Sequence, residues 1–199
     1  KSSGFRQVTP DSTTAEAGDE PLLMARSLPH ASVYVDRDRV NGIREIIRRD
    51  PETGTVILDD GFQHRAVKAG MNIILTDHNR LITHDRLLPM GMLREQIKAV
   101  RRADVIIVTK CPDKISGAER QKISEELRAA GAVIPVYFTT LAYESPRHLS
   151  TEITREITPA THILMVTGIA NPAPMAEYLR GIGGNLTQIT FPDHHTYTT

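Results

Sequence analysis

Thr55-Val56-Ile57-Leu58-Asp59-Asp60-Gly61-Phe62-Gln63-His64 is the most informative stretch of this sequence. Its first four residues are apolar or β-branched, which is typical of a buried parallel strand. Two carboxylates follow at once, so a strand at 55–58 would deliver them to the carboxyl edge of a sheet, where α/β proteins bind ligands. Neighbouring carboxylates can hold a hard cation such as Mg²⁺, which commonly bridges to phosphates. The stretch therefore points to phosphoryl transfer, although an ordinary Asp-Gly turn has the same residues.

The composition excludes several classes of protein. The chain has 199 residues, enough for one or two domains, and 40% of them are hydrophobic, which is enough to form a core. Its formal net charge is zero, which argues against a dedicated nucleic-acid binder. Cys111 is the single cysteine, so no internal disulfide can form. This cysteine content is compatible with a protein of the reducing cytosol. No stretch approaches the roughly 20 apolar residues that a transmembrane helix needs.

Strands and helices are expected to alternate along the chain. Apolar spacing and cap residues predict helices at 21–27, 41–49, 91–101, 116–130 and 174–180. Ser116 and Glu119 form a predicted capping box, and Gly131 is a predicted C-cap. Apolar runs predict strands at 32–35, 55–58, 72–76, 104–109, 133–138, 162–167 and 186–191, while residues 1–18 are expected to form a loop. This alternation over short connections indicates parallel βαβ units and an α/β fold.

Three further motifs could carry chemistry, and each has a plainer alternative. In Gly18-Asp19-Glu20-Pro21, an acid could act as a base, or both acids could simply complement a helix dipole. In Asp193-His194-His195, an acid could tune a neighbouring histidine as a general base; a zinc site or a surface pair without a role are the alternatives. Arg94-Glu95 could place a guanidinium on a phosphate, or could lie on a solvated helix face.

Together these segments resemble one family, the tetraacyldisaccharide 4'-kinases, which are the lipid A kinases of Gram-negative bacteria. The resemblance covers nearly the whole chain, and the order and approximate spacing of its phrases also match. The phrases are Gly18-Asp19-Glu20-Pro21-Leu22-Leu23, Leu58-Asp59-Asp60-Gly61-Phe62-Gln63-His64-Arg65, Leu87-Leu88-Pro89-Met90-Gly91-Met92-Leu93-Arg94-Glu95, Gly168-Ile169-Ala170-Asn171-Pro172 and Phe191-Pro192-Asp193-His194. The phrase around Asp59 and Asp60 is the most specific of them.

The resemblance implies ATP-dependent phosphorylation of the 4'-hydroxyl of the tetraacyldisaccharide 1-phosphate precursor of lipid A, a step of lipopolysaccharide biosynthesis. It implies ATP and Mg²⁺ as cofactors, the lipid as substrate, no nucleic acid, and peripheral contact with the cytoplasmic face of the inner membrane. The implied fold is a P-loop-kinase-like α/β/α sandwich, incomplete here, with a second, smaller α/β domain. We expect residues 1–70 to be part of the N-terminal kinase domain, carrying the Walker B strand, and 71–199 to be the smaller domain.

The resemblance also implies roles for individual residues. Asp19 would be the general base that takes the proton of the sugar hydroxyl, and His194 would orient it. Asp59 and Asp60 would be the Walker B acids that organise Mg²⁺. The other implied site residues are Glu20 near the metal, Gln63 and His64 at the cofactor, and Arg94 and Glu95 from the second domain.

One motif of P-loop kinases is missing from this sequence. The P-loop, Gly-x-x-x-x-Gly-Lys-Ser/Thr, cradles phosphates and places a lysine on them. No such phrase occurs, and Gly181-Ile182-Gly183-Gly184 lacks the lysine. In the family the P-loop would precede Lys1, so we expect this chain to be a soluble fragment that is inactive alone. The alternatives are another P-loop-type NTPase or ligase, or a non-catalytic binding fragment.

Overall fold

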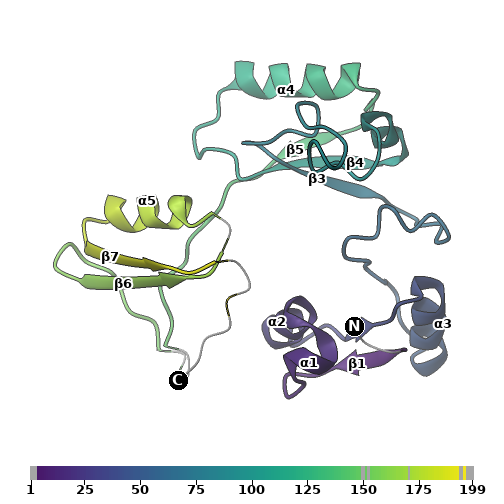
Figure 1. Cartoon of the computed structure of the whole chain (residues 1–199), viewed down its shortest axis with the longest axis horizontal. Coiled ribbons are helices and arrows are strands. Elements are labelled where there is room, and N and C mark those ends of the chain that lie inside the picture. Colours follow the sequence, from purple (N-terminus) through teal and green to yellow (C-terminus); the bar gives the residue numbers. More distant parts are fainter. Residues whose placement is uncertain (1–3, 149–150, 152, 170, 193–194, 196–199) are drawn as a thin grey trace. The chain divides into compact units, whose positions relative to one another are not determined.

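The computed structural model describes residues 4–148, 151, 153–169, 171–192 and 195. The chain divides into two compact units, Lys1–Leu141 and Ala142–Thr199 (Figure 1). Both units combine helices with parallel strands, which confirms the predicted α/β class. The predicted domain boundary after residue 70 stays a prediction, because these units are groups of residues in contact and do not by themselves identify a kinase domain.

The N-terminal part of the first unit is a small sheet with helices beside it. Its elements are β1 (Arg6–Val8), α1 (Thr14–Ala17), α2 (Asp19–Ser27), β2 (Val33–Val35) and α3 (Arg39–Arg49). β1 and β2 pair antiparallel, and Val8, Ala17 and Ala25 form the buried cluster beside them. Residues 1–18, which we predicted to be a loop, therefore contain a strand and a helix that are too short to show an apolar period.

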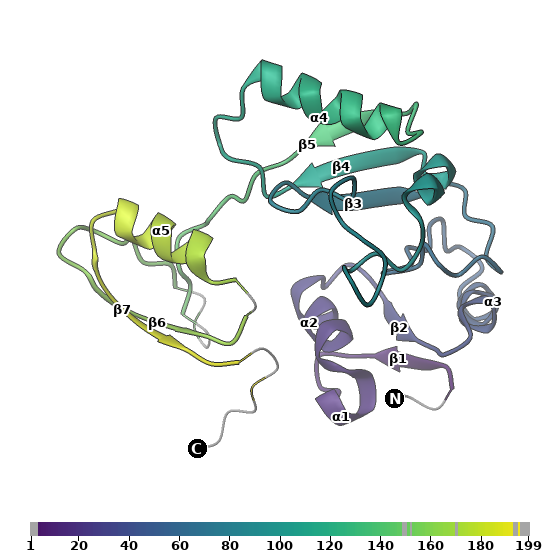
Figure 2. The same cartoon turned by 45° about the horizontal axis from the view of Figure 1, so that its top comes forward.

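The rest of the first unit contains a parallel sheet with a helix on one face. Its elements are β3 (Ile73–Asp77), the 3₁₀ helix η1 (Ile97–Arg102), β4 (Val105–Thr109), α4 (Gly117–Ala129) and β5 (Val136–Phe138). The strand order is β3-β4-β5, and all pairs are parallel. α4 lies along the sheet in both views (Figures 1 and 2). Ile106, Val108 and Leu127 are fully buried between them, so this interface is the main core.

The second unit is a single βαβ motif. β6 (His162–Thr167) and β7 (Asn185–Thr190) pair in parallel, and α5 (Ala173–Gly181) connects them (Figure 2). Ala176 and Leu179 of α5 are buried together with Met165 of β6. In the described parts of both units, no helix has the length and apolar character needed to cross a bilayer.

Two predicted elements are wrong. Residues 55–58 do not form a strand, and the side chain of Ile57 is 87% exposed. A strand needs a neighbour for its backbone N–H and C=O groups, and no described residue supplies one to this segment. The predicted helix 91–101 is a tight turn followed by η1, because contacts from residues before the segment hold its first half in the turn.

Candidate functional site

Asp59 and Asp60 lie on a tight turn. Asp60 has φ +49°, a left-handed conformation that Asp adopts more readily than most residues. A Cβ added at Gly61 would lie 2.7 Å from Cβ of Leu58, so the turn requires glycine there. Asp59 and Asp60 are both exposed. The chain therefore presents two adjacent acids to solvent from a closely packed bend.

Arg94 meets this turn from another part of the first unit. Its Nη1 lies 2.5 Å from Oδ2 of Asp60 in an ion pair. The side chains are 56% and 62% exposed, so the pair is open to water and adds little to stability. Its importance is geometric, because it joins two residues that we predicted for the site although they lie 34 positions apart.

Arg102 makes a second connection between the same two segments. Its guanidinium donates to both carboxylate oxygens of Glu95, at 2.8 and 3.1 Å, and to the carbonyl oxygen of Phe62 at 3.2 Å. It also lies 4.4 Å from the centre of the Phe62 ring. The hydrogen bonds from Arg102 hold the pKa of Glu95 below its ordinary value, so Glu95 is a carboxylate at neutral pH.

The turn before Arg94 is organised by Asp85. Its Oδ1 accepts the amide hydrogens of Arg86 at 2.8 Å and Met92 at 3.2 Å, and a guanidinium hydrogen of Arg80 at 3.0 Å. Burial alone would raise the pKa of Asp85, but these hydrogen bonds outweigh it and hold the pKa below its ordinary value. Asp85 therefore fixes the chain two residues before Arg94.

Asp19 and Glu20 form the first turn of α2. Gly18, with φ +92°, precedes them as the N-cap, and Oδ1 of Asp19 accepts the amide hydrogen of Glu20 at 3.1 Å. Both acids are exposed and complement the positive end of the helix dipole. Their helical position fits the plain interpretation of this motif.

Several predicted site residues are not joined to the Asp59–Asp60 turn by contacts among the described residues. His194 lies outside the described residues, as does Asp193. The exposed side chains of Gln63 and His64 have no recorded hydrogen bond to another described residue. Within the described ranges, no three His, Cys, Asp or Glu side chains gather closely enough to hold a metal ion. That Glu20 joins Asp59 and Asp60 at a metal therefore stays a prediction.

The chemistry of the two adjacent acids nevertheless suits Mg²⁺. This ion is usually bound through one or two carboxylates, with water and substrate phosphates completing its octahedron. Asp59 and Asp60 supply two carboxylates on one turn, and Arg94 beside them is suited to bind a phosphate. The arrangement can thus present a divalent cation and an arginine to the same phosphate.

Ionisable side chains that our sequence analysis did not single out meet at the carboxyl ends of β3 and β4. Lys110 Nζ is 2.8 Å from Oδ2 of Asp77, and His78 Nε2 is 3.0 Å from Oε1 of Glu119. Burial alone would raise the pKa of Asp77, but the bond from Lys110 leads the contacts that hold it below its ordinary value. The strand-end position was the available signal, since ligands bind at this edge in α/β sheets.

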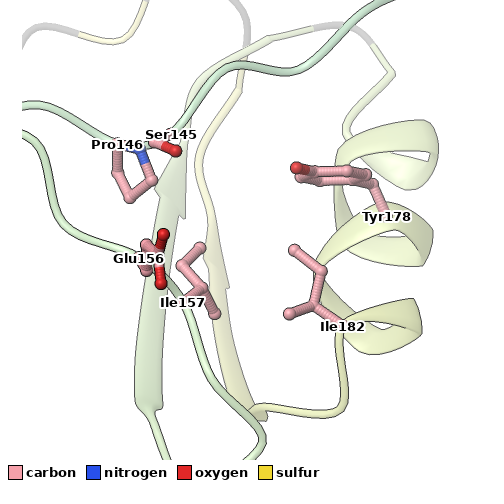
Figure 3. A pocket seen from close by; sticks show the side chains of 6 residues that line it. All are labelled: Ser145, Pro146, Glu156, Ile157, Tyr178 and Ile182. Atoms are coloured by element: carbon pink, nitrogen blue, oxygen red, sulfur yellow. The ribbon is translucent and has the colours of Figure 1, made fainter.

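The second unit has a shallow pocket of its own, with a volume of about 170 Å³ (Figure 3). Glu156 and Tyr178 face it from opposite sides in the close view. Tyr178 stacks on Tyr143 with ring centres 4.4 Å apart. None of the predicted site residues that the structure describes lines this pocket, and the site geometry given above comes from the first unit.

The fold is mixed α/β, and the first unit brings acids and arginines together on two segments, an arrangement compatible with an enzyme that handles phosphate. The chain belongs to the tetraacyldisaccharide-1-P 4'-kinase family, whose family model matches residues 1–199. The resemblance seen in the sequence is therefore confirmed.

Individual relatives agree with this assignment. Proteins named tetraacyldisaccharide 4'-kinase are 40% identical over 204 residues in Phocaeicola vulgatus, 39% over 200 in Cytophaga hutchinsonii and 35% over 199 in Flavobacterium johnsoniae. Each match covers 100% of this chain but only 56%, 56% and 58% of the relative. The chain thus spans little more than half the length of these relatives. No solved structure matches it.

Proposed function

We propose that this chain is the acid-bearing part of an ATP- and Mg²⁺-dependent kinase that phosphorylates the 4'-hydroxyl of a tetraacyldisaccharide 1-phosphate in lipid A biosynthesis. The ion pair between Arg94 and Asp60 carries the proposal. It supports a common site for two motifs that lie 34 positions apart in the sequence. Family membership supports the substrate class.

The proposed roles are those that the family resemblance implies for these residues, and each suits the chemistry of its side chain. Asp19 takes the proton of the sugar hydroxyl and His194 orients it, as a general acid–base pair. Asp59 and Asp60, with Glu20, would hold Mg²⁺, which neutralises charge on the transferred phosphate. Arg94 binds the transferred phosphate, and Glu95 supports Arg94. Gln63 and His64 lie beside the bound ATP. The proposed fold is a P-loop-kinase-like sandwich with a smaller closing domain, at the cytoplasmic face of the inner membrane.

The isolated chain is proposed to transfer little or no phosphate. Its sequence has no Gly-x-x-x-x-Gly-Lys-Ser/Thr phrase to cradle ATP. A chimera supplies what is missing: this chain replaces the matching segment of the Phocaeicola vulgatus relative, which it matches along its whole length.

The test measures transfer of labelled phosphate from ATP to tetraacyldisaccharide 1-phosphate, with Mg²⁺, by the chain alone and by the chimera. The proposal expects labelled lipid from the chimera, none from the chain, and a large loss in the chimera with Asp60→Asn. Free phosphate without labelled lipid would replace the kinase by another NTPase or a ligase. Turnover by the chain alone would refute its proposed inactivity.

A further inference from the structure

Arg102 touches both loops of the candidate site at once. Its two terminal nitrogens reach the Glu95 carboxylate, and one of them also reaches the carbonyl oxygen of Phe62. Glu95 directly follows Arg94, and Phe62 comes two residues after Asp60. Arg102 therefore joins the same two loops as the Arg94–Asp60 pair, through different atoms.

The contacts of Arg102 are better protected than those of Arg94. The side chains of Arg102 and Glu95 are 32% and 27% exposed, about half the values for Arg94 and Asp60. Water screens a partly buried pair less than an exposed one. The guanidinium also lies over the Phe62 ring, which adds a cation–π attraction. Of the two connections, that of Arg102 is the one able to hold the loops in place.

The contact set is specific for arginine. A planar guanidinium can engage both oxygens of a carboxylate, donate to a carbonyl and stack on a ring in the same pose. A lysine ammonium is a compact point charge and cannot reproduce this fork. Replacement by lysine would therefore keep the charge and lose the geometry.

We propose that Arg102 is a positioning residue for phosphoryl transfer: it clamps Glu95 and the Phe62 carbonyl, and so sets the Asp59–Asp60 turn against Arg94. The proposal rests on the kinase function proposed above. Arg102 acts through its neighbours and need not touch the substrate. Residues that support metal ligands and catalytic groups in this way typically contribute about 10–100-fold in metal affinity or activity.

The clamp itself can be tested in the 199-residue chain without any activity. The sequence has no tryptophan, so Phe62→Trp introduces a single tryptophan on the turn, which can be excited selectively over the five tyrosines. In this background, Arg102→Ala is expected to increase acrylamide quenching and to shift the emission to longer wavelength. Arg101→Ala, which removes the same charge from an exposed neighbour in η1, is the matched control and is expected to change neither. Equal spectra for Arg102→Ala and the control would overturn the clamp.

The positioning role is tested by kinetics in the chimera. Arg102→Ala is expected to lower kcat about 10–100-fold with little change in KM for ATP or lipid. Arg102→Lys should not restore kcat, and Arg101→Ala should leave it unchanged. Arg102→Ala should add little to the loss caused by Glu95→Gln, because the two share one interaction.

The possible results separate this inference from the proposed function. Independent, multiplying losses for Glu95→Gln and Arg102→Ala, or an unchanged kcat in Arg102→Ala, would overturn the positioning role. If the unsubstituted chimera transfers no phosphate, the proposed function fails, and the quenching experiment in the chain still decides whether Arg102 clamps the two loops. Circular dichroism of each variant identifies any that does not fold.

Discussion

Gly91→Ala is predicted to open the turn that carries Arg94. A Cβ at this position would lie 2.6 Å from the backbone nitrogen of Arg86, and closer still to the Arg86 carbonyl oxygen and Oδ1 of Asp85. Two of these three atoms are backbone, so rotating a side chain cannot relieve the overlap. The two sides of the turn, 85–87 and 91–93, would have to separate.

The cost follows from the hydrogen bonds that cross this turn. Separation breaks the bond from the Met92 amide to Asp85 at 3.2 Å and the bond from the Leu93 amide to the Arg86 carbonyl at 2.9 Å. A hydrogen bond to a charged group contributes about 1.5–3 kcal/mol and a neutral one about 0.5–1.5 kcal/mol. The free energy of unfolding should therefore fall by about 2–4.5 kcal/mol.

Urea unfolding followed by circular dichroism measures this change. With an m value of about 2 kcal/mol/M, the midpoint should fall by roughly 1–2 M. Gly54→Ala is the matched control, because an added Cβ there meets no atom within 4 Å. Hydrogen exchange should be faster at Met92 and Leu93 in Gly91→Ala only. Equal urea midpoints for the two variants would refute the crowding argument.

Three more changes have expected outcomes. Leu127→Ala removes a fully buried side chain under α4 and should cost about 2–5 kcal/mol in urea unfolding; a cost below about 1 kcal/mol would place Leu127 outside the core. The pKa of folded Glu95 lies below its ordinary value of 4.5, so its contribution is complete above that pH and is lost as the pH falls through the lowered pKa. The difference in stability between wild type and Glu95→Gln should therefore shrink below pH 4.5, and a constant difference would contradict the Arg102 contact. In the chimera, Asp19→Asn should lower kcat about 10²–10⁴-fold with KM for ATP nearly unchanged, and near-normal turnover would exclude Asp19 as the base.

Elements whose signals are local were predictable from the sequence. The strand predicted at 162–167 is β6 with the same bounds, because its apolar run finds a neighbour, β7, within the same βαβ motif. Ser116 caps α4 by accepting the Glu119 amide hydrogen at 3.1 Å, which is one half of the predicted capping box, while the Glu119 carboxylate lies 3.0 Å from His78 Nε2 instead of closing the box. Gly131 follows the helix with φ +110°. In these cases the residue types alone carry the physical reason for the structure.

Elements that depend on distant partners were not predictable. Residues 55–58 have the composition of a strand, but a ladder needs a neighbour, and the described residues place none beside them. The helical spacing at 91–101 was misleading because the Leu93 carbonyl accepts the Leu88 amide hydrogen at 3.0 Å, whereas a helix would direct that carbonyl to an amide four residues further on. The short β1 depends on its pairing with β2 for the same reason.

In the candidate site, too, residue types could be predicted from the sequence, but contacts between distant residues could not. The acids and Arg94 were chosen by residue type, but the contact between Asp60 and Arg94 spans 34 positions and has no sequence pattern. Arg102 was missed because Arg101-Arg102 reads as an ordinary charged pair on a helix end. Its carbonyl and ring contacts with Phe62 become visible only when the two loops are placed in space.

Asp59 and Asp60 are held by a turn and not by the end of a strand. At the end of a strand, ladder hydrogen bonds on both sides would fix the carboxylates. In the described structure the acids lie on a turn closed by its own backbone, with the His64 amide donating to the Gly61 carbonyl at 2.9 Å, and it is joined to the 94–102 segment by two arginines. The position of the acids relative to Arg94 therefore depends on side-chain contacts. Since such contacts depend on guanidinium geometry, conservative changes at Arg94 or Arg102 disturb the site more than changes along 55–58.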